Sequence, residues 1–376
     1  MKKVTYVLLA VALVLALAYA LINPLIIFLV KRQLGATFSG SQVSLGGCRF
    51  TPARRLSLSE INIKRKQLYD FRIKTAEINY SLTALLRGEI LNISLKQAGL
   101  SVNLPQQAVV ELKQYLNLGP PGWLRINALE LSDINLDFNT KDLTIQSVFS
   151  CRLDLAAQAI EYLDFQVESL GLAGVKLNNA SLRAAQDLPA GNLDIGQLKY
   201  DKLQLTAIKG KTRLKGNRLS VEELSAQALN GAVQGELTVS IAQEIDYLLD
   251  LRFLNLDIKS LVDDFNLKDK FEMSGSLSGS VAVQGRGARI TVLGGDFSSD
   301  SPGGILIIKD KALLENLAGQ TNESLDLLVE NFKNYRYNTG TLRLSLEQNN
   351  LLLDVALDGD TGKRNLNITL HELNSK

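Results

Sequence analysis

The chain opens with an uncharged run, and almost everything after that run has the alternating pattern of β-strands. Val4–Ile22 contains no charged side chain, and the apolar character continues as far as Val30, just before Lys31. About 20 apolar residues cross a bilayer. We therefore expect residues 1–32 to form an N-terminal membrane anchor and residues 33–376 to form one domain beside the membrane.

A cleaved secretory signal is the competing interpretation of the first residues. Lys2-Lys3 forms a basic start, and Ala18-Tyr19-Ala20 resembles a cleavage site. The apolar run is long for a signal and resumes at Leu25, which favours an uncleaved anchor. Long domains are translocated largely regardless of charge, so we expect the domain to lie on the translocated side.

The composition excludes some functions and describes the apolar surface. The 41 basic and 39 acidic residues leave a net charge of +2, which provides no basic field for nucleic acid. Hydrophobic residues make up 46% of the chain but aromatic residues only 6%. We therefore expect a smooth aliphatic surface without large aromatic anchors. Cys48 and Cys151 are either a disulfide in an oxidising compartment or two small core residues.

One strand pattern occurs three times. Leu56–Ile63, Leu129–Phe138 and Leu219–Ala226 alternate apolar and polar residues, but each has two adjacent polar residues in its middle. Such a pair would turn the following side chains to the opposite face unless a bulge or bend absorbs one residue. The pattern predicts bent strands that keep one apolar face, and bends of this kind curve a sheet. A second repeat, Gly231–Val239 and Gly275–Val283, predicts strands that begin at glycine kinks.

Helical periodicity is confined to a few short segments, which are Ala108–Leu116, Ile258–Phe265, Ala312–Leu317 and Ser324–Phe332. Four short helices cannot cover a long sheet. The fold class that we expect is mainly β: an N-terminal transmembrane helix followed by an elongated, twisted β-sheet groove with a few short helices. Either the sheet closes on itself as a sandwich or barrel, or its apolar face holds a ligand.

The strand segments resemble the AsmA-like envelope proteins. The N-terminal likeness lies in Leu56–Ile63 and Ile73–Ile90, where a strand pair runs into a Ser-Leu-Thr-Ala-Leu-Leu-Arg-Gly turn. The C-terminal likeness, to the YdbH branch, lies in Gly275–Gly285, in Pro302–Ile307 and in the stretch before Leu342–Leu357.

The resemblance implies a protein anchored in the bacterial inner membrane, single-pass, with a periplasmic β-groove of the bridge-like lipid-transfer type related to TamB and YhdP. It implies phospholipid as the molecule carried, in support of envelope lipid homeostasis and outer-membrane biogenesis. Members of the YdbH branch are usually far longer than this chain. An outer-membrane lipoprotein or further copies of the groove are therefore expected partners.

The residues that we expect to line the groove are the apolar members of the repeated strands. They are Leu56, Leu58, Ile61, Ile63, Leu129, Leu131, Ile134, Leu136, Val221, Leu224, Leu237, Val239, Leu277, Val281 and Val283.

Residues for catalysis or metal binding are sparse. His371 is the only histidine, and one histidine with two distant cysteines argues against a zinc site. Asp296, Asp300 and Asp310 lie among glycines, but their spacing matches no calcium loop. We expect no enzyme, no metal and no cofactor.

Two other functions remain open on the sequence. The chain could be a non-catalytic assembly or structural factor that binds protein partners through the edges of its sheet. It could also be a secreted β-sandwich binding module, which would require cleavage after Ala20.

Overall fold

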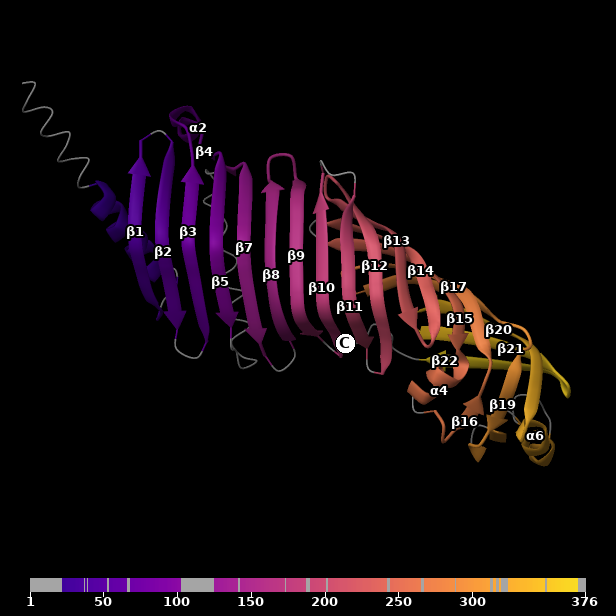
Figure 1. Cartoon of the computed structure of the whole chain (residues 1–376). Coiled ribbons are helices and arrows are strands. Elements are labelled where there is room, and N and C mark those ends of the chain that lie inside the picture. Colours follow the sequence, from indigo (N-terminus) through magenta and orange to yellow (C-terminus); the bar gives the residue numbers. More distant parts are fainter. Residues whose placement is uncertain are drawn as a thin grey trace, which may run out of the picture. The chain divides into compact units, whose positions relative to one another are not determined.

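β-Strands form most of the described chain (Figure 1). The computed structural model describes residues 22–36, 38, 40–52, 54–65, 68–102, 125–140, 143–172, 174–186, 190–200, 202–241, 244–264, 267–287, 289–311, 314–315, 318, 324–348 and 350–370. The chain divides into two compact units, of which unit 1 ends at Ala173 and unit 2 begins at Gly174.

Unit 1 contains a helix over residues 22–36 and a sheet of long strands. Its elements are β1 (Gln42–Thr51), β2 (Arg55–Arg65), β3 (Tyr69–Asn79), α2 (Leu82–Leu86), β4 (Glu89–Ile90), β5 (Asn92–Val102), β6 (Arg125–Ile126), β7 (Ala128–Asn139), β8 (Leu143–Asp154) and β9 (Ala159–Leu172). The long strands follow the order β1-β2-β3-β5-β7-β8-β9. All neighbours are antiparallel except β5 and β7, which are parallel.

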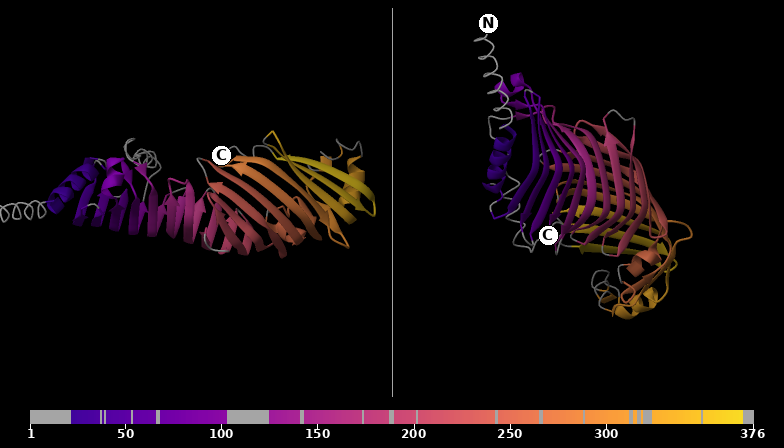
Figure 2. Two further views of the ribbon diagram at one scale, coloured as in Figure 1. Left: turned by 90° about the horizontal axis from the view of Figure 1, so that it is seen from above. Right: turned by 60° about the vertical axis from the view of Figure 1, so that its left-hand side comes forward.

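The helix over residues 22–36 lies along the edge strand β1 (Figure 2, right). Its Ile27, Val30 and Leu34 pack against the apolar cluster of the sheet. The backbone N–H of Phe50 in β1 donates to Oδ1 of Asn23 at 3.0 Å. An edge strand normally offers unpaired backbone groups to other chains, and this helix covers part of that edge.

The strands of both units bend where the repeated sequence pattern predicts it. Glu60, Asp133 and Glu223 are the second members of the three adjacent polar pairs, and all three have left-handed backbones with φ of 53°, 55° and 52°. The register shifts between Leu131 and Ile134 in β7 and between Val221 and Leu224 in β13. The predicted bends are therefore confirmed, and each keeps the apolar side chains before and after it on one face.

Unit 2 contains a second series of antiparallel strands. Its elements are β10 (Val175–Ala185), β11 (Gly191–Tyr200), β12 (Leu203–Lys215), β13 (Arg218–Ala228), β14 (Gly231–Ile241), β15 (Ile245–Asp257), α4 (Ile258–Asp264), β16 (Phe271–Met273), β17 (Ser276–Arg286), β18 (Arg289–Ser299), β19 (Gly304–Ile308), α6 (Leu325–Phe332), β20 (Tyr335–Glu347), β21 (Asn350–Gly359) and β22 (Gly362–Leu370). Consecutive long strands pair in the order β10 to β15, then β17, β18, β20, β21 and β22.

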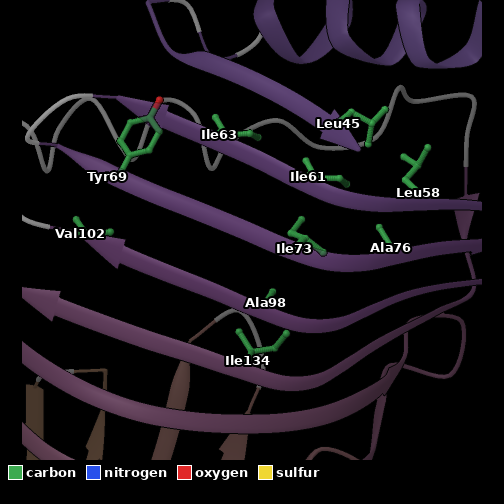
Figure 3. Close-up of a cluster of buried hydrophobic side chains, with 10 residues drawn as sticks. All are labelled: Leu45, Leu58, Ile61, Ile63, Tyr69, Ile73, Ala76, Ala98, Val102 and Ile134. Atoms are coloured by element: carbon green, nitrogen blue, oxygen red, sulfur yellow. The ribbon is translucent and has the colours of Figure 1, made fainter. Parts of the chain in front are cut away.

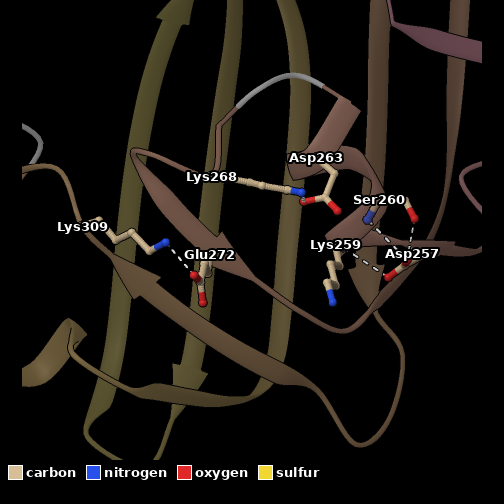
Figure 4. Close-up of polar contacts among 7 residues, drawn as sticks. All are labelled: Asp257, Lys259, Ser260, Asp263, Lys268, Glu272 and Lys309. Atoms are coloured by element: carbon tan, nitrogen blue, oxygen red, sulfur yellow. Dashed lines mark hydrogen bonds and ion pairs between the residues drawn. The ribbon is translucent and has the colours of Figure 1, made fainter.

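A small packed region forms where β16 pairs with β19 and β19 pairs with the start of β20. Its core contains Phe332 of α6 and the two tyrosines Tyr335 and Tyr337 of β20, each exposed by 1% or less. Ion pairs lie around α4 and β16 (Figure 4), where Lys268 contacts Asp263 and Lys309 contacts Glu272. Both ion pairs are solvent-exposed, so each contributes little to stability.

Asp257 caps the start of α4. Its carboxylate accepts from the hydroxyl of Ser260 at 2.6 Å and from the backbone N–H of Lys259 at 3.2 Å (Figure 4). Burial raises the pKa of the Asp257 carboxyl, but these hydrogen bonds outweigh it and hold the pKa below its usual value. The carboxylate satisfies backbone donors that a helix start leaves unpaired.

The predicted helices are confirmed where the structure describes them. α4 and α6 match the predictions for Ile258–Phe265 and Ser324–Phe332, with Ser324 as the N-cap of α6. Ala108–Leu116, most of Ala312–Leu317 and the first 21 residues of the predicted anchor lie outside the described residues. Within the described part of the chain, no helix has the length and hydropathy to cross a bilayer.

Candidate functional site

Apolar side chains in unit 1 form rows that run from strand to strand. The pairing register places Phe50, Leu56, Ile78, Ile93, Leu129 and Leu153 opposite one another in one row. A second row contains Cys48, Leu58, Ala76, Leu95, Leu131, Cys151 and Leu163. Because side chains in register across a sheet point to the same side, these rows form one continuous apolar face.

Unit 2 has the same arrangement. One row contains Val221, Leu237, Leu249, Val283 and Leu293. The next contains Leu224, Gly235, Leu251, Val281, Gly295, Leu344 and Leu353. In each unit, "the apolar face" below means the face that carries these rows, and "the polar face" means the opposite one.

All fifteen residues predicted to line the groove lie on the apolar faces, eight in unit 1 and seven in unit 2. Six of them are buried, which are Leu58, Ile61, Ile63, Ile134, Val221 and Leu224. The other nine are half-buried. The face therefore offers both packed and water-accessible aliphatic groups.

The buried clusters on these faces come from neighbouring strands of one sheet. In Figure 3, the ten buried side chains of unit 1 lie on the inner side of the bend in the strands, on β1, β2, β3, β5 and β7. The cluster of unit 2 comes from β11 to β15. A sandwich core would contain side chains of two opposed sheets. Among the described residues of either cluster, no such second layer contributes a side chain.

Aromatic rings also lie on the apolar faces, which corrects the expectation of a purely aliphatic surface. Phe149 of β8 and Phe165 of β9 have ring centroids 6.3 Å apart, and Phe253 of β15 and Phe297 of β18 are 5.6 Å apart. Gly279 lies between Phe253 and Phe297 in the register. A Cβ on Gly279 would come within 2.6 Å of the Phe297 ring. The low overall aromatic content did not reveal that these few rings lie on the apolar faces.

The sequence analysis also missed residues that complete the rows, such as Leu249, Leu251 and Leu344. Each follows the same alternation as the predicted residues. Only the pairing register shows that they stand beside Val283, Val281 and Gly295.

The polar faces carry cross-strand ion pairs. Glu77 of β3 contacts Arg55 at 3.0 Å and Lys96 at 3.2 Å, one partner on each neighbouring strand. The hydrogen bond from Arg72 lowers the pKa of the Asp70 carboxyl. Charged pairs of this kind keep the polar face in water, so the two faces differ sharply in chemistry.

A hollow of about 930 Å³ in unit 2 is lined by polar and charged residues and also by Leu224, Leu251, Val281 and Leu344 of the apolar row. Its walls include Glu236 and Asp250, together with Arg343, which pairs with Asp296 at 3.0 Å. Its lining thus combines charged groups, which make burial of a hydrocarbon chain costly, with residues of the apolar row.

Cys48 and Cys151 are both free thiols. They occupy the same row of unit 1 but are separated by five strand spacings, or roughly 24 Å. A disulfide requires Cα atoms within about 7 Å, so the open question of their pairing is answered: they do not pair. Burial raises the pKa of both thiols, which makes them poor nucleophiles.

The carboxylates considered for calcium have other partners. Asp296 pairs with Arg343, and Asp300 accepts from the hydroxyl of Ser278 at 3.0 Å. The described residues contain no group of three or more His, Cys, Asp or Glu side chains placed to hold a metal ion. His371 lies outside the described residues.

The comparison with protein families matches the part of the chain that carries both apolar rows of unit 2. The pattern of the YdbH-like family, described as the intermembrane phospholipid transport protein YdbH, matches residues 140–372, which is more than half of the chain. The chain belongs to the YdbH-like family. The resemblance to this branch is thereby confirmed, and the family is one of intermembrane phospholipid transport.

No curated protein matches this YdbH-like chain, and no solved structure does. The family match covers β8 to β22. It includes all seven predicted residues of unit 2 and none of the eight of unit 1.

Proposed function

We propose that this YdbH-like chain shields phospholipid acyl chains along its apolar faces, which act as a hydrophobic β-groove for lipid transfer in the cell envelope. The observation that carries the proposal is the alignment of apolar residues into rows across seven strands of unit 1 and, with Gly235 and Gly295 among them, from β13 to β21 in unit 2. The family match supports phospholipid as the molecule transported.

The energetics of lipid transfer fit such a face. Each buried CH₂ contributes about 0.8 kcal/mol. Removing two acyl chains of roughly sixteen carbons from a bilayer therefore costs on the order of 25 kcal/mol in water. Half-buried Leu and Val side chains in continuous rows can replace much of that contact at every step. Transfer makes and breaks no covalent bond, so the proposal assigns no catalytic residue and no cofactor.

The proposal places the chain at the bacterial inner membrane, with residues 1–32 as a single-pass anchor and the domain in the periplasm. The described part of that segment supports contact with a bilayer. In the helix over residues 22–36, Leu25, Phe28 and Leu29 are 57%, 61% and 51% exposed. An outer-membrane lipoprotein or further copies of the chain are the proposed partners.

Photocrosslinking tests the proposal directly. A photoreactive amino acid replaces Leu131 or Val281 on the apolar faces, or Ser57 or Ser280 on the polar faces, in the full chain in cell membranes. We expect phospholipid adducts, detected by mass spectrometry, at Leu131 and Val281 and not at the serines. Equal labelling at all four positions would overturn the proposal.

Strand addition by a protein partner is the rival function. At β1 the structure does not favour strand addition, because the helix over residues 22–36 lies along that edge. The N–H of Phe50 already donates a hydrogen bond to Asn23. Protein adducts without lipid adducts at Leu131 would support the rival.

A further inference from the structure

Four exposed leucines cluster around the short helix α2 at one end of the unit 1 sheet. Leu82 is 62% exposed, Leu85 42%, Leu86 88% and Leu91 43%. These four residues are called the leucine tip. Single exposed leucines are ordinary on protein surfaces, but a group of them around one turn is typical of an interaction site.

Hydrogen bonds beside α2 fix its start, and the large side chains of the leucine tip point outward. The hydroxyl of Ser81 caps α2 by accepting from the N–H of Ala84 at 3.0 Å. The hydroxyl of Tyr80 donates to the carbonyl of Thr51 at 3.2 Å. Of the α2 residues, Ala84 is buried. The small Ala84 thus faces the protein and the leucines face away. In a helix that packs on its own core, the large apolar residues face the protein instead.

Basic side chains surround the leucine tip. Arg54, Arg87 and Arg125 are exposed, and none forms an ion pair with any described residue. Glu89, which pairs with Arg125 between strands β4 and β6, places one carboxylate beside them. Leucines ringed by unpaired arginines match the interface of an anionic bilayer, where apolar groups enter the acyl boundary and cations meet lipid phosphates.

The start of the helix over residues 22–36 lies at the same end of the sheet. Asn23 bonds to Phe50, and the ring of Phe50 stacks on Tyr80, directly before α2, with centroids 6.4 Å apart. Figure 1 shows α2 beyond the strand ends on this side. The predicted anchor and the leucine tip would therefore reach a bilayer together.

We propose that the leucine tip is a second membrane contact, which inserts into the surface of an anionic phospholipid bilayer. This inference rests on the proposed role at a membrane. Insertion holds the ends of β1 to β7 against the bilayer. The row that begins at Phe50 and Leu56 is the row nearest this end, so it is the first apolar row that a departing acyl chain meets.

Fluorescence quenching tests the proposal. The full chain with Cys48→Ala and Cys151→Ala carries one new cysteine, Leu85→Cys, labelled with an environment-sensitive dye and reconstituted in vesicles that contain brominated phosphatidylglycerol. The matched control is Asn139→Cys, an exposed residue at the other end of β7. We expect strong quenching of the dye at position 85 and none at 139. A dye at position 85 that stays in water and is not quenched would overturn the proposal. So would a dye that is shielded from the lipid by a bound protein.

Two further variants separate the apolar and electrostatic contributions. Leu82→Ser with Leu86→Ser should reduce the membrane-inserted fraction at position 85 by about tenfold or more. Arg87→Glu changes the local charge by two units. It should reduce the inserted fraction by roughly fivefold for each unit, and only in anionic vesicles. An inserted fraction that neither change alters would contradict the proposal.

The same preparations distinguish this proposal from the proposed function. Lipid adducts at Leu131 together with an unquenched dye at the leucine tip would contradict the second membrane contact and support lipid shielding. Quenching of the dye at the leucine tip without lipid adducts at Leu131 would support the second membrane contact and contradict lipid shielding.

Discussion

Tyr337 shows how a polar atom is accommodated inside the small packed region around β16, β19 and α6 in unit 2. Its side chain is 1% exposed, and its hydroxyl donates to the carbonyl oxygen of Ser274 at 2.6 Å. Tyr335 similarly donates to the carbonyl of Gly362 at 2.6 Å. Burial raises the pKa of Tyr337 to about 12. Each phenol thus stays neutral and tied to the backbone of another segment.

This burial predicts a loss of stability at high pH. The unfolded phenol has a pKa of about 10, and the folded one about 12. Between these values the folded state binds more protons, so the free energy of unfolding falls as pH rises, by up to about 1.4 kcal/mol per pH unit for one group. Urea unfolding at pH 9, 10 and 11 measures the slope. Tyr337→Phe should flatten it and cost about 1–2 kcal/mol at neutral pH, whereas the exposed Tyr200→Phe should change neither.

At the scale of elements, the bends determine how the strands keep one apolar face. Gln97, Asn179, Ala207 and Asn255 are left-handed like the three predicted bend residues. Lys96-Gln97 and Asn178-Asn179 are adjacent polar pairs, so the sequence contains the same signal at these two bends. Ala207 and Asn255 do not belong to adjacent polar pairs, because they follow Thr206 and Leu254 as single members. Only the register shifts against the partner strands reveal those two bends.

The bend in β7 predicts a position-specific cost. Asp133 has φ of 55°, and its N–H donates to the hydroxyl of Ser150 at 2.9 Å. A β-branched residue fits this backbone poorly, so Asp133→Val should lower the free energy of unfolding by about 1–3 kcal/mol. Asp137→Val is the control. It lies in the same strand and is also exposed, and valine suits an ordinary strand position. Equal unfolding midpoints for the two variants would contradict this account.

At the scale of the whole molecule, the proposed function requires that the apolar rows of each unit act as a path rather than as separate sites. Leu131 lies in unit 1 and Val281 in unit 2, and both are half-buried among apolar neighbours. On a path, a charge at one position blocks the transfer of every lipid that must pass that position. The same charge displaces only part of the lipid bound along the whole face.

We therefore expect Leu131→Asp or Val281→Asp to lower lipid transfer between vesicles by tenfold or more, because a carboxylate against hydrocarbon is costly. The lipid bound per chain, measured by mass spectrometry, should fall by far less. Ser57→Asp and Ser280→Asp on the polar faces should leave transfer unchanged. Parallel losses of transfer and of bound lipid would indicate independent sites instead of a path.

The sequence by itself determined the strand-rich fold, the three bends at Glu60, Asp133 and Glu223, and the set of apolar residues that share a face. These features depend on local alternation and on polar pairs within one strand, which can be read without knowing the neighbours. Both Ser59-Glu60 and Ser132-Asp133 are sufficient to place a bend.

Only the tertiary structure decided which apolar residues stand side by side, where rings such as Phe253 and Phe297 meet, and that Cys48 and Cys151 stay apart. It also brought Asn23, Phe50 and Tyr80 together at the end where α2 exposes its leucines. These facts depend on strand register and on contacts between residues distant in sequence, and no local pattern encodes them.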